Sequence, residues 1–182
     1  SIESYNKALS LKPDYVDAYN NDGNALRDQG QLKSAIKAYQ TALSLEPKYA
    51  EVHNNIGLIL HQQGKLEGSI ESFKKAILLK PDYADAYNNV GNALKDLDQL
   101  EQAIKAYKNA ISLKPGYAVA HNNLSFAFLN SGRFREGLAE YEWRWKTSDF
   151  SSKRRHFSQP LWDGVENLKT VSYTHLTLPT SD

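Results

Sequence analysis

Residues 81–115 read PDYADAYNNVGNALKDLDQLEQAIKAYKNAISLKP, and this stretch decides the fold. Its apolar residues recur every three or four positions, first over 87–97 and then over 100–111. This spacing places them on one face of each of two helices. The same pattern repeats every 34 residues, with proline at 13, 47, 81 and 115 and tyrosine at 15, 49, 83 and 117. A fixed period of this length predicts a solenoid of stacked helical hairpins.

Each period contains two helices separated by a short polar break. Gly30 and Gly64 lie in such breaks and are expected to adopt the left-handed backbone that ends a first helix. The prolines are expected to end the second helices, because proline cannot continue a helix. The first helices are predicted near 16–29, 50–63, 84–97 and 118–131, and the second near 32–45, 66–79, 100–113 and 134–146. A lone second helix is predicted at 2–11.

These helices divide the chain into repeats and flanking segments. Residues 1–15 would hold the second helix of a truncated repeat, and the full repeats are expected at 16–49, 50–83, 84–117 and 118–146, the last of them degenerate and capping. Segment 147–170 is expected to be a cap or a linker toward a domain beyond this chain. Residues 171–182 resemble a translated sequencing adaptor, so this tail is expected to be non-native; the alternative is a native first strand, since Val, Tyr, Leu and Thr favour strands. The chain lacks an initial methionine and is interpreted as a fragment.

The pattern resembles the tetratricopeptide repeat (TPR) over residues 1–146. In the third copy the residues that carry the resemblance are Tyr87, Val90, Gly91, Leu94, Ala103, Tyr107, Ala110 and Pro115. The resemblance implies an all-α fold, a right-handed superhelical solenoid whose first helices line the concave side. A glycine inside a helix costs roughly 1 kcal/mol relative to alanine. We therefore expect Gly57 and Gly91 to permit close approach of the second helix, meeting Ser69 and Ala103.

Four positions depart from the repeat pattern. Asp22 stands where the other copies have apolar residues, so its carboxylate is expected to be semi-exposed, paired or locally destabilising. Ser125 replaces the glycine in the fourth copy. His53 and His121 occupy the position of a packing aromatic, and we expect a structural role for both rather than metal binding.

An Asn-Asn pair recurs in all four predicted first helices, although asparagine is a mediocre helix former. A side-chain amide donates and accepts hydrogen bonds, so a column of amides suits capture of an extended peptide by its backbone. The arrangement is similar to the asparagine ladder of the O-linked N-acetylglucosamine transferase family, and the matching residues are Asn21, Asn55, Asn89 and Asn123. The side chains expected to tune selectivity beside them are Asn20, Asn54, Asn88, Asn92, Arg27, His61 and Lys95. The alternative is that asparagine is only a surface residue duplicated with the repeat.

Charge and composition argue against several other ligands. Aspartates at the rim would disfavour acidic ligands, and amides and Asp85 replace the basic residues that a carboxylate clamp needs. The 22 basic and 21 acidic residues leave no electrostatic footprint for nucleic acid or an anionic membrane. Cysteine is absent, and no metal-ligand cluster or catalytic constellation stands out, so no cofactor, metal or unaided catalysis is predicted. We expect a cytoplasmic protein of bacterial origin.

Three functions remain open at this point. The first is a protein-interaction module that binds an extended peptide or a partner protein in the concave groove. The second rests on the stretches YEWRW at 141–145 and PLWDG at 160–164. They resemble the junction in bacterial proteins where a nucleotide-sugar glycosyltransferase-like domain follows such repeats, which implies a substrate-recruiting arm with its catalytic domain missing here. The alternative for this segment is a hydrophobic cap. The third function is a scaffold that self-associates end to end.

Overall fold

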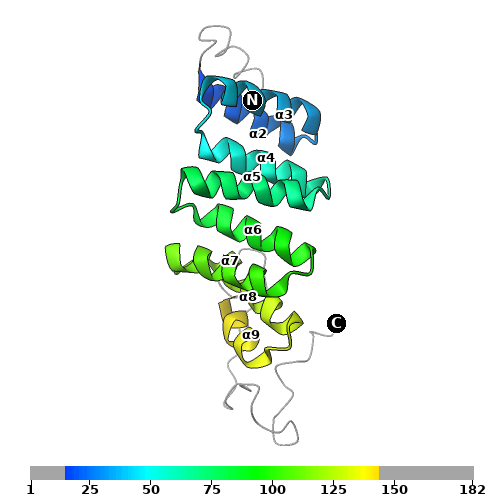
Figure 1. Ribbon diagram of the computed structural model, residues 1–182, viewed down its shortest axis with the longest axis vertical. Helices are drawn as coiled ribbons and strands as arrows, with labels where there is room; N and C mark the ends of the chain where they lie inside the picture. The colour runs from blue at the N-terminus through cyan, green and yellow to red at the C-terminus, as the bar shows by residue number, and fades with distance from the viewer. Residues whose placement is uncertain (1–14, 144–182) are drawn as a thin grey trace, which may run out of the picture.

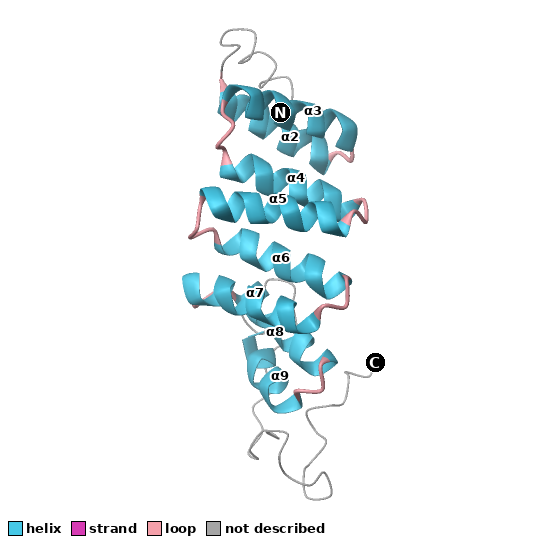
Figure 2. Ribbon diagram, in the orientation of Figure 1, coloured by secondary structure: helices cyan, strands magenta, loops and turns pink. Residues whose placement is uncertain are grey.

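The computed structural model describes residues 15–143 as four helical hairpins stacked along one axis (Figure 1). This part of the chain contains eight helices and no strand (Figure 2). The hairpins pair α2 (Val16–Asp28) with α3 (Leu32–Leu45), α4 (Ala50–Gln62) with α5 (Leu66–Leu79), α6 (Ala84–Asp96) with α7 (Leu100–Leu113), and α8 (Ala118–Asn130) with α9 (Phe134–Tyr141). The predicted all-α solenoid of helical hairpins is confirmed.

The helix boundaries agree with the sequence pattern to within about one residue, except at the end. Helix α9 ends at Tyr141 and a 3₁₀ turn follows at 142–143, while residues 144–146 of the predicted helix lie outside the described part of the chain. The predicted helix at 2–11, the linker at 147–170 and the tail at 171–182 lie outside the described residues. None of the helices within 15–143 is long and apolar enough to cross a membrane.

The turn inside each hairpin uses one residue with a left-handed backbone. Gly30, Gly64 and Gly132 have φ values of 76°, 72° and 76°. Glycine adopts this conformation without steric cost, as the sequence predicted for the first two. In the third hairpin Asp98 takes the same place with φ 59°, which is tolerable because aspartate visits this region more readily than most residues.

The helical glycines permit close packing, and the nearest side chain is not the expected one. A Cβ on Gly91 would lie 2.4 Å from Cε1 of Tyr107, and one on Gly57 would lie 2.5 Å from Cε1 of Phe73. The nearest atoms to these glycines thus belong to the aromatic rings, and the predicted contact with Ser69 and Ala103 stays a prediction. The aromatic ring of the second helix, one turn further on, fills the space that the missing side chain leaves.

The first helices form the inner side of the stack. Helix α2 contacts α4, α4 contacts α6 and α6 contacts α8, whereas within residues 15–143 successive second helices make no such contact. Helices that approach each other more closely lie on the concave side of a curved stack. The inner face of the solenoid is thus built from the first helices.

One interface between hairpins is looser than the others. The contact between α3 and α4 is smaller than those between α5 and α6 or α7 and α8. Helix α4 brings Val52 and Ile59 to the core it shares with α3, and both are fully buried. At the equivalent positions α6 and α8 carry alanines. The larger side chains hold α4 further from α3, because a filled interface cannot close around extra methyl groups.

Candidate functional site

The two asparagines of each pair have different environments. Adjacent residues on a helix point about 100° apart, so both side chains cannot face the same way. The first members Asn20, Asn54 and Asn88 are buried, with exposures of 8%, 5% and 4%. The second members are more accessible: Asn21 is exposed, and the side chains of Asn55, Asn89 and Asn123 are half-buried.

Hydrogen bonds join the pairs of successive repeats into a line. Asn55 Nδ2 donates to Asn20 Oδ1 at 3.0 Å, and Asn89 Nδ2 donates to Asn54 Oδ1 at 3.0 Å. Asn123 Nδ2 donates to Asn88 Oδ1, again at 3.0 Å. In each bond the buried first asparagine accepts from the second asparagine of the next repeat. We call the second members Asn21, Asn55, Asn89 and Asn123 the ladder amides.

The four ladder amides differ in the hydrogen-bonding capacity they retain. An amide carries two N–H donors and one oxygen with two lone pairs. Asn55 and Asn89 each use one N–H toward the preceding repeat and keep the other. Asn123 also donates to Asn92 Oδ1 at 3.1 Å, which occupies both of its N–H groups. The Asn21 side chain has no hydrogen-bond partner among the residues that the structure describes.

A second amide position joins the inner face to the core. The Tyr107 hydroxyl donates to Asn92 Oδ1 at 2.9 Å, and the Tyr39 hydroxyl donates to Asn24 Oδ1 at 2.7 Å. In the second repeat the equivalent aromatic is Phe73, which has no hydroxyl, and the equivalent inner residue is a leucine. Asn92 is thus held from within the hairpin.

Three side chains predicted to tune selectivity lie along the ends of the first helices and have acidic partners. His61 Nε2 lies 2.8 Å from Asp96 Oδ2 of the following repeat. Lys95 Nζ is 3.4 Å from Asp96 Oδ1. Arg27 pairs with its neighbour Asp28 at 3.0 Å. A ligand that meets these side chains must compete with existing ion pairs.

The inner face becomes apolar in the fourth repeat. Val119 and Phe126 on α8 are exposed by 48% and 45%. They stand at positions that are acidic or hold asparagine or leucine in the earlier repeats. Phe126 contacts the ring of Tyr141 edge-on, with centroids 6.0 Å apart. The surface therefore changes from amides and carboxylates at α2–α6 to aliphatic and aromatic side chains at α8.

Both buried histidines pack against the loop that precedes their helix. His53 Nε2 is 3.3 Å from the Pro47 carbonyl oxygen, and His121 Nε2 is 2.9 Å from that of Pro115. His121 also stacks on Trp143, with ring centroids 3.8 Å apart. Within residues 15–143 no group of three or more His, Cys, Asp or Glu side chains gathers to hold a metal ion.

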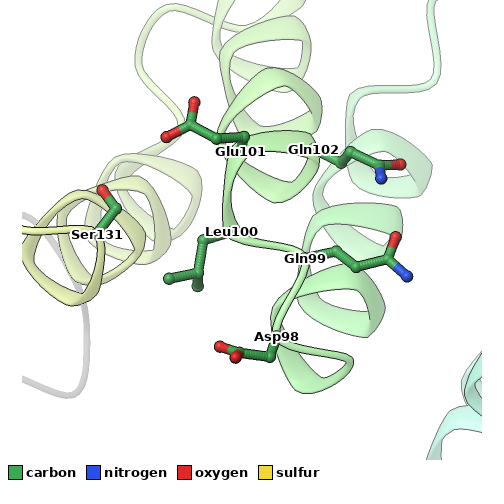
Figure 3. A pocket seen from close by; sticks show the side chains of 6 residues that line it. All are labelled: Asp98, Gln99, Leu100, Glu101, Gln102 and Ser131. Carbon is green, nitrogen blue, oxygen red and sulfur yellow. The ribbon is translucent and has the colours of Figure 1, made fainter.

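An open pocket lies away from the ladder amides, beside the turn between α6 and α7 (Figure 3). Its lining residues are Asp98, Gln99, Leu100, Glu101, Gln102 and Ser131. It contains none of the residues predicted from the sequence to bind a ligand. Asp98, Leu100 and Glu101 extend toward the side where Ser131 lies, whereas Gln99 and Gln102 extend to the opposite side.

Sequence reasoning recognised the asparagine pairs but gave both members a role on the surface. The helical repeat itself held the signal that separates them, since two consecutive residues cannot share one face of a helix. Asn20, Asn54 and Asn88 lie inside the seam between repeats, and they orient the ladder amides. Their pairing with residues 35 positions ahead was the feature that sequence reasoning missed.

Helical hairpins that stack into a solenoid define the class of helical-repeat proteins, whose concave surfaces bind other molecules. The family model of the TPR repeat matches residues 23–64, 57–98 and 91–132, so the chain belongs to the TPR repeat family. The TPR repeat fold is that of a protein-interaction module.

Several solved structures share this fold. The crystal structure of MamA is 26% identical, covers 80% of this chain and 85% of its own, and has a TM-score of 0.69. PilF of Pseudomonas aeruginosa is 19% identical, covers 78% of this chain and 65% of its own, and has a TM-score of 0.72. The first TPR of Spaghetti (RPAP3), bound to the HSP90 peptide SRMEEVD, is 24% identical, covers 64% and 93%, and has a TM-score of 0.62. No curated protein matches the chain.

Proposed function

We propose that the inner face of this solenoid binds an extended polypeptide through its main chain. The observation that carries the proposal is the line of hydrogen bonds that orients Asn55, Asn89 and Asn123 at a constant register of 35 residues. A main-chain peptide group offers one N–H and one C=O. An oriented amide with a free oxygen and a free N–H, as Asn55 and Asn89 retain, complements both.

The other predicted residues would act at two levels. Asn20, Asn54 and Asn88 are buried, so they would influence selectivity through the orientation of the ladder amides. Asn92 would act in the same way through Asn123. Three polar side chains at the helix ends would select among ligand side chains, and these are Arg27, His61 and Lys95.

The chemistry of the surface argues for the ligand class. Inner-face acids such as Asp85 oppose an acidic ligand, and the basic cluster of a carboxylate clamp is absent from the equivalent positions within residues 15–143. Exposed Val119 and Phe126 would accommodate an apolar side chain at the α8 end. We therefore favour a neutral or basic polypeptide that carries an apolar residue where it passes α8.

Selection from a library of randomised dodecapeptides, followed by titration of the selected peptides, tests the proposal. Changing both Asn55 and Asn89 to alanine should weaken binding at least about tenfold, since each lost hydrogen bond is worth about 1 kcal/mol. Asn109→Ala, an exposed asparagine on the outer helix α7, is the matched control. N-methylation along the peptide backbone should weaken binding more than alanine substitution of most peptide side chains.

Two results would reject main-chain recognition. One is unchanged affinity of the Asn55→Ala/Asn89→Ala variant for the selected peptides. The other is insensitivity of binding to backbone N-methylation. The acidic peptide SRMEEVD serves as a negative probe, and tight binding of it would contradict the charge argument.

A second candidate function is that the solenoid recruits substrate for a glycosyltransferase domain encoded downstream. It is supported only by the sequence at 141–145 and 160–164, of which residues 144 onward lie outside the described part of the chain. In that case this chain would bind a protein substrate and would not itself catalyse a reaction. Sequencing the gene beyond residue 170 decides this, because a glycine-rich α/β domain would support it and any other domain would reject it.

A further inference from the structure

The three interfaces between successive hairpins contain a recurring group of three residues. An acid at the start of a first helix faces a tyrosine of the next loop, and a third residue ends the intervening second helix. The groups are Asp17, Tyr49 and Glu46; Glu51, Tyr83 and Lys80; and Asp85, Tyr117 and Lys114. In the second and third groups the third residue is a lysine, and in the first it is a glutamate.

The second group contains an ammonium group, that of Lys80, which the other two residues contact. Lys80 Nζ donates to Glu51 Oε1 at 2.8 Å and lies 4.9 Å from the centroid of the Tyr83 ring. An ammonium group over an aromatic face and beside a carboxylate gains from both interactions. The neighbouring carboxylate of Glu51 raises the pKa of Lys80, so this lysine stays charged.

The third group shows the same stacking without the ion pair. Lys114 Nζ lies 4.7 Å from the centroid of the Tyr117 ring. Burial raises the pKa of the Tyr117 hydroxyl, and the hydrogen bond from this hydroxyl to Asp85 raises it further. An ammonium group over the tyrosine ring is thus a feature of both later groups, and in the second group a carboxylate also binds it.

The first group has the same framework but no ammonium group. The Tyr49 hydroxyl donates to Asp17 Oδ1 at 2.6 Å. Burial raises the pKa of Tyr49 above its ordinary range, and three surrounding carboxylates raise it further: Asp17, Glu51 and Glu46. Among residues 15–143, no lysine or arginine stacks on the Tyr49 ring or forms an ion pair with Asp17 or Glu46.

The backbone shows that the third position is built alike in all three groups. Glu46, Lys80 and Lys114 have φ/ψ values of −133°/90°, −136°/88° and −136°/83°. In each case its carbonyl oxygen accepts a hydrogen bond from the tyrosine N–H, at 3.3, 3.1 and 2.9 Å. The first group therefore differs from the others in a side chain and its charge, and its backbone retains the same conformation.

We infer that the Asp17–Glu46–Tyr49 group binds a lysine or arginine side chain of the partner polypeptide, which takes the place that Lys80 and Lys114 occupy in the later repeats. The inference rests on the proposed binding of a polypeptide along the inner face, since Asp17 lies in the first turn of α2, four residues before the ladder amide Asn21 and on the same side of the helix. The cation would stack on the Tyr49 ring between two carboxylates. The partner would then carry a basic residue where it passes the α2–α4 interface.

A direct test uses acetyl-tetralysine amide as the probe, with nuclear magnetic resonance of the tyrosine rings as the readout. We expect the peptide to shift the Tyr49 ring signals of the wild-type protein at low salt. Glu46→Lys, which supplies the ammonium group from within the chain, should weaken this binding about tenfold, the combined scale of one cation–π contact and one ion pair. Glu71→Lys makes the same change in net charge on the outer face and should leave binding unchanged.

A reciprocal variant tests the design of the group. Lys80→Glu converts the second group into the pattern of the first, so it should create a second tetralysine site whose signals are those of Tyr83. Equal binding of tetralysine to the wild type and Glu46→Lys would overturn the inference. A decrease of the same size in tetralysine binding to the Glu71→Lys control would also overturn it, because the decrease would then follow from net charge alone.

The two proposals fail in different ways. Asn55→Ala/Asn89→Ala should keep the tetralysine site while losing the peptides selected from the random library. Those peptides should be enriched in lysine or arginine at one position when selected on the wild type, and the enrichment should disappear on Glu46→Lys. Library peptides that depend on the ladder amides but show no basic preference would overturn the cation site and leave main-chain recognition intact.

Discussion

Replacing Gly91 with alanine should destabilise the solenoid, although alanine is the better helix former. The new Cβ would lie 2.4, 2.6 and 2.8 Å from Cε1, Cδ1 and Cζ of Tyr107. That ring is completely buried, so it has no space into which to retreat. Overpacking of this kind costs about 1–3 kcal/mol, and displacement of the Tyr107 hydroxyl from Asn92 adds about 1 kcal/mol. The higher helix propensity of alanine offsets about 1 kcal/mol of this cost. The unfolding free energy should therefore decrease by about 1–3 kcal/mol.

A second glycine in the same solenoid provides the control. A Cβ on Gly68, in helix α5, would meet only Leu60 Cδ1 at an ordinary contact distance of 3.7 Å. Gly68→Ala should therefore stabilise the protein by up to about 1 kcal/mol. Urea unfolding followed by circular dichroism measures both variants. Because repeat arrays need not unfold in one step, their transitions are compared with a nearest-neighbour model. If Gly91→Ala is neutral or stabilising like Gly68→Ala, the assignment of the glycine to the aromatic ring is wrong.

The remaining predictions concern three buried polar residues. Asp22 has a buried Oδ1 with no hydrogen-bond partner among the described residues, so Asp22→Val should raise the unfolding free energy by about 1–3 kcal/mol at neutral pH. Burial raises the pKa of Asp22, so this gain should shrink as the pH falls through that pKa, because protonation already relieves the penalty. Burial lowers the pKa of His53 from 6.5, so the unfolding free energy should decrease as the pH drops from 6.5 to the lowered pKa. His53→Tyr should remove this pH dependence from unfolding free energies measured by urea titration at several pH values. Asn54→Leu removes the acceptor of Asn89 and should lower the unfolding free energy by about 1 kcal/mol. It should also increase the mobility of the Asn89 side-chain amide in nuclear magnetic resonance relaxation measurements, and Asn109→Leu is the control.

The fold was predictable because its signals are local and repeated. Proline and glycine end helices through their backbone conformations, and the apolar stripe marks the buried face of each helix. The 34-residue period repeats each of these signals along the chain. Asp98 shows the limit of reading single residues, since it takes the turn position that glycine holds elsewhere. The end of α9 at Tyr141 was missed because no terminating proline or glycine marks it.

The site was predictable only in its residue types. Which asparagine of a pair is buried depends on the angle at which one hairpin stacks on the next, and that angle arises from packing across the interface. The close approach of Tyr107 to Gly91 was not predicted for the same reason, because a ring on the next helix reaches further than the residue directly opposite. The change from Glu46 in the first repeat to Lys80 in the second is visible in the sequence. That the Lys80 ammonium group stacks on the Tyr83 ring is visible only in the structure.

Core packing and the inner face are connected through one chain of contacts. Gly91 allows the Tyr107 ring to lie against its helix, the Tyr107 hydroxyl holds Asn92, and Asn92 takes the second N–H of Asn123. Asn123 is then fixed but can only accept, whereas Asn89 is fixed by one bond and can still donate. An amide that is oriented yet still able to donate gains most from a ligand, because its ordering cost is met before binding. The middle of the ladder should therefore contribute more to main-chain recognition than either end.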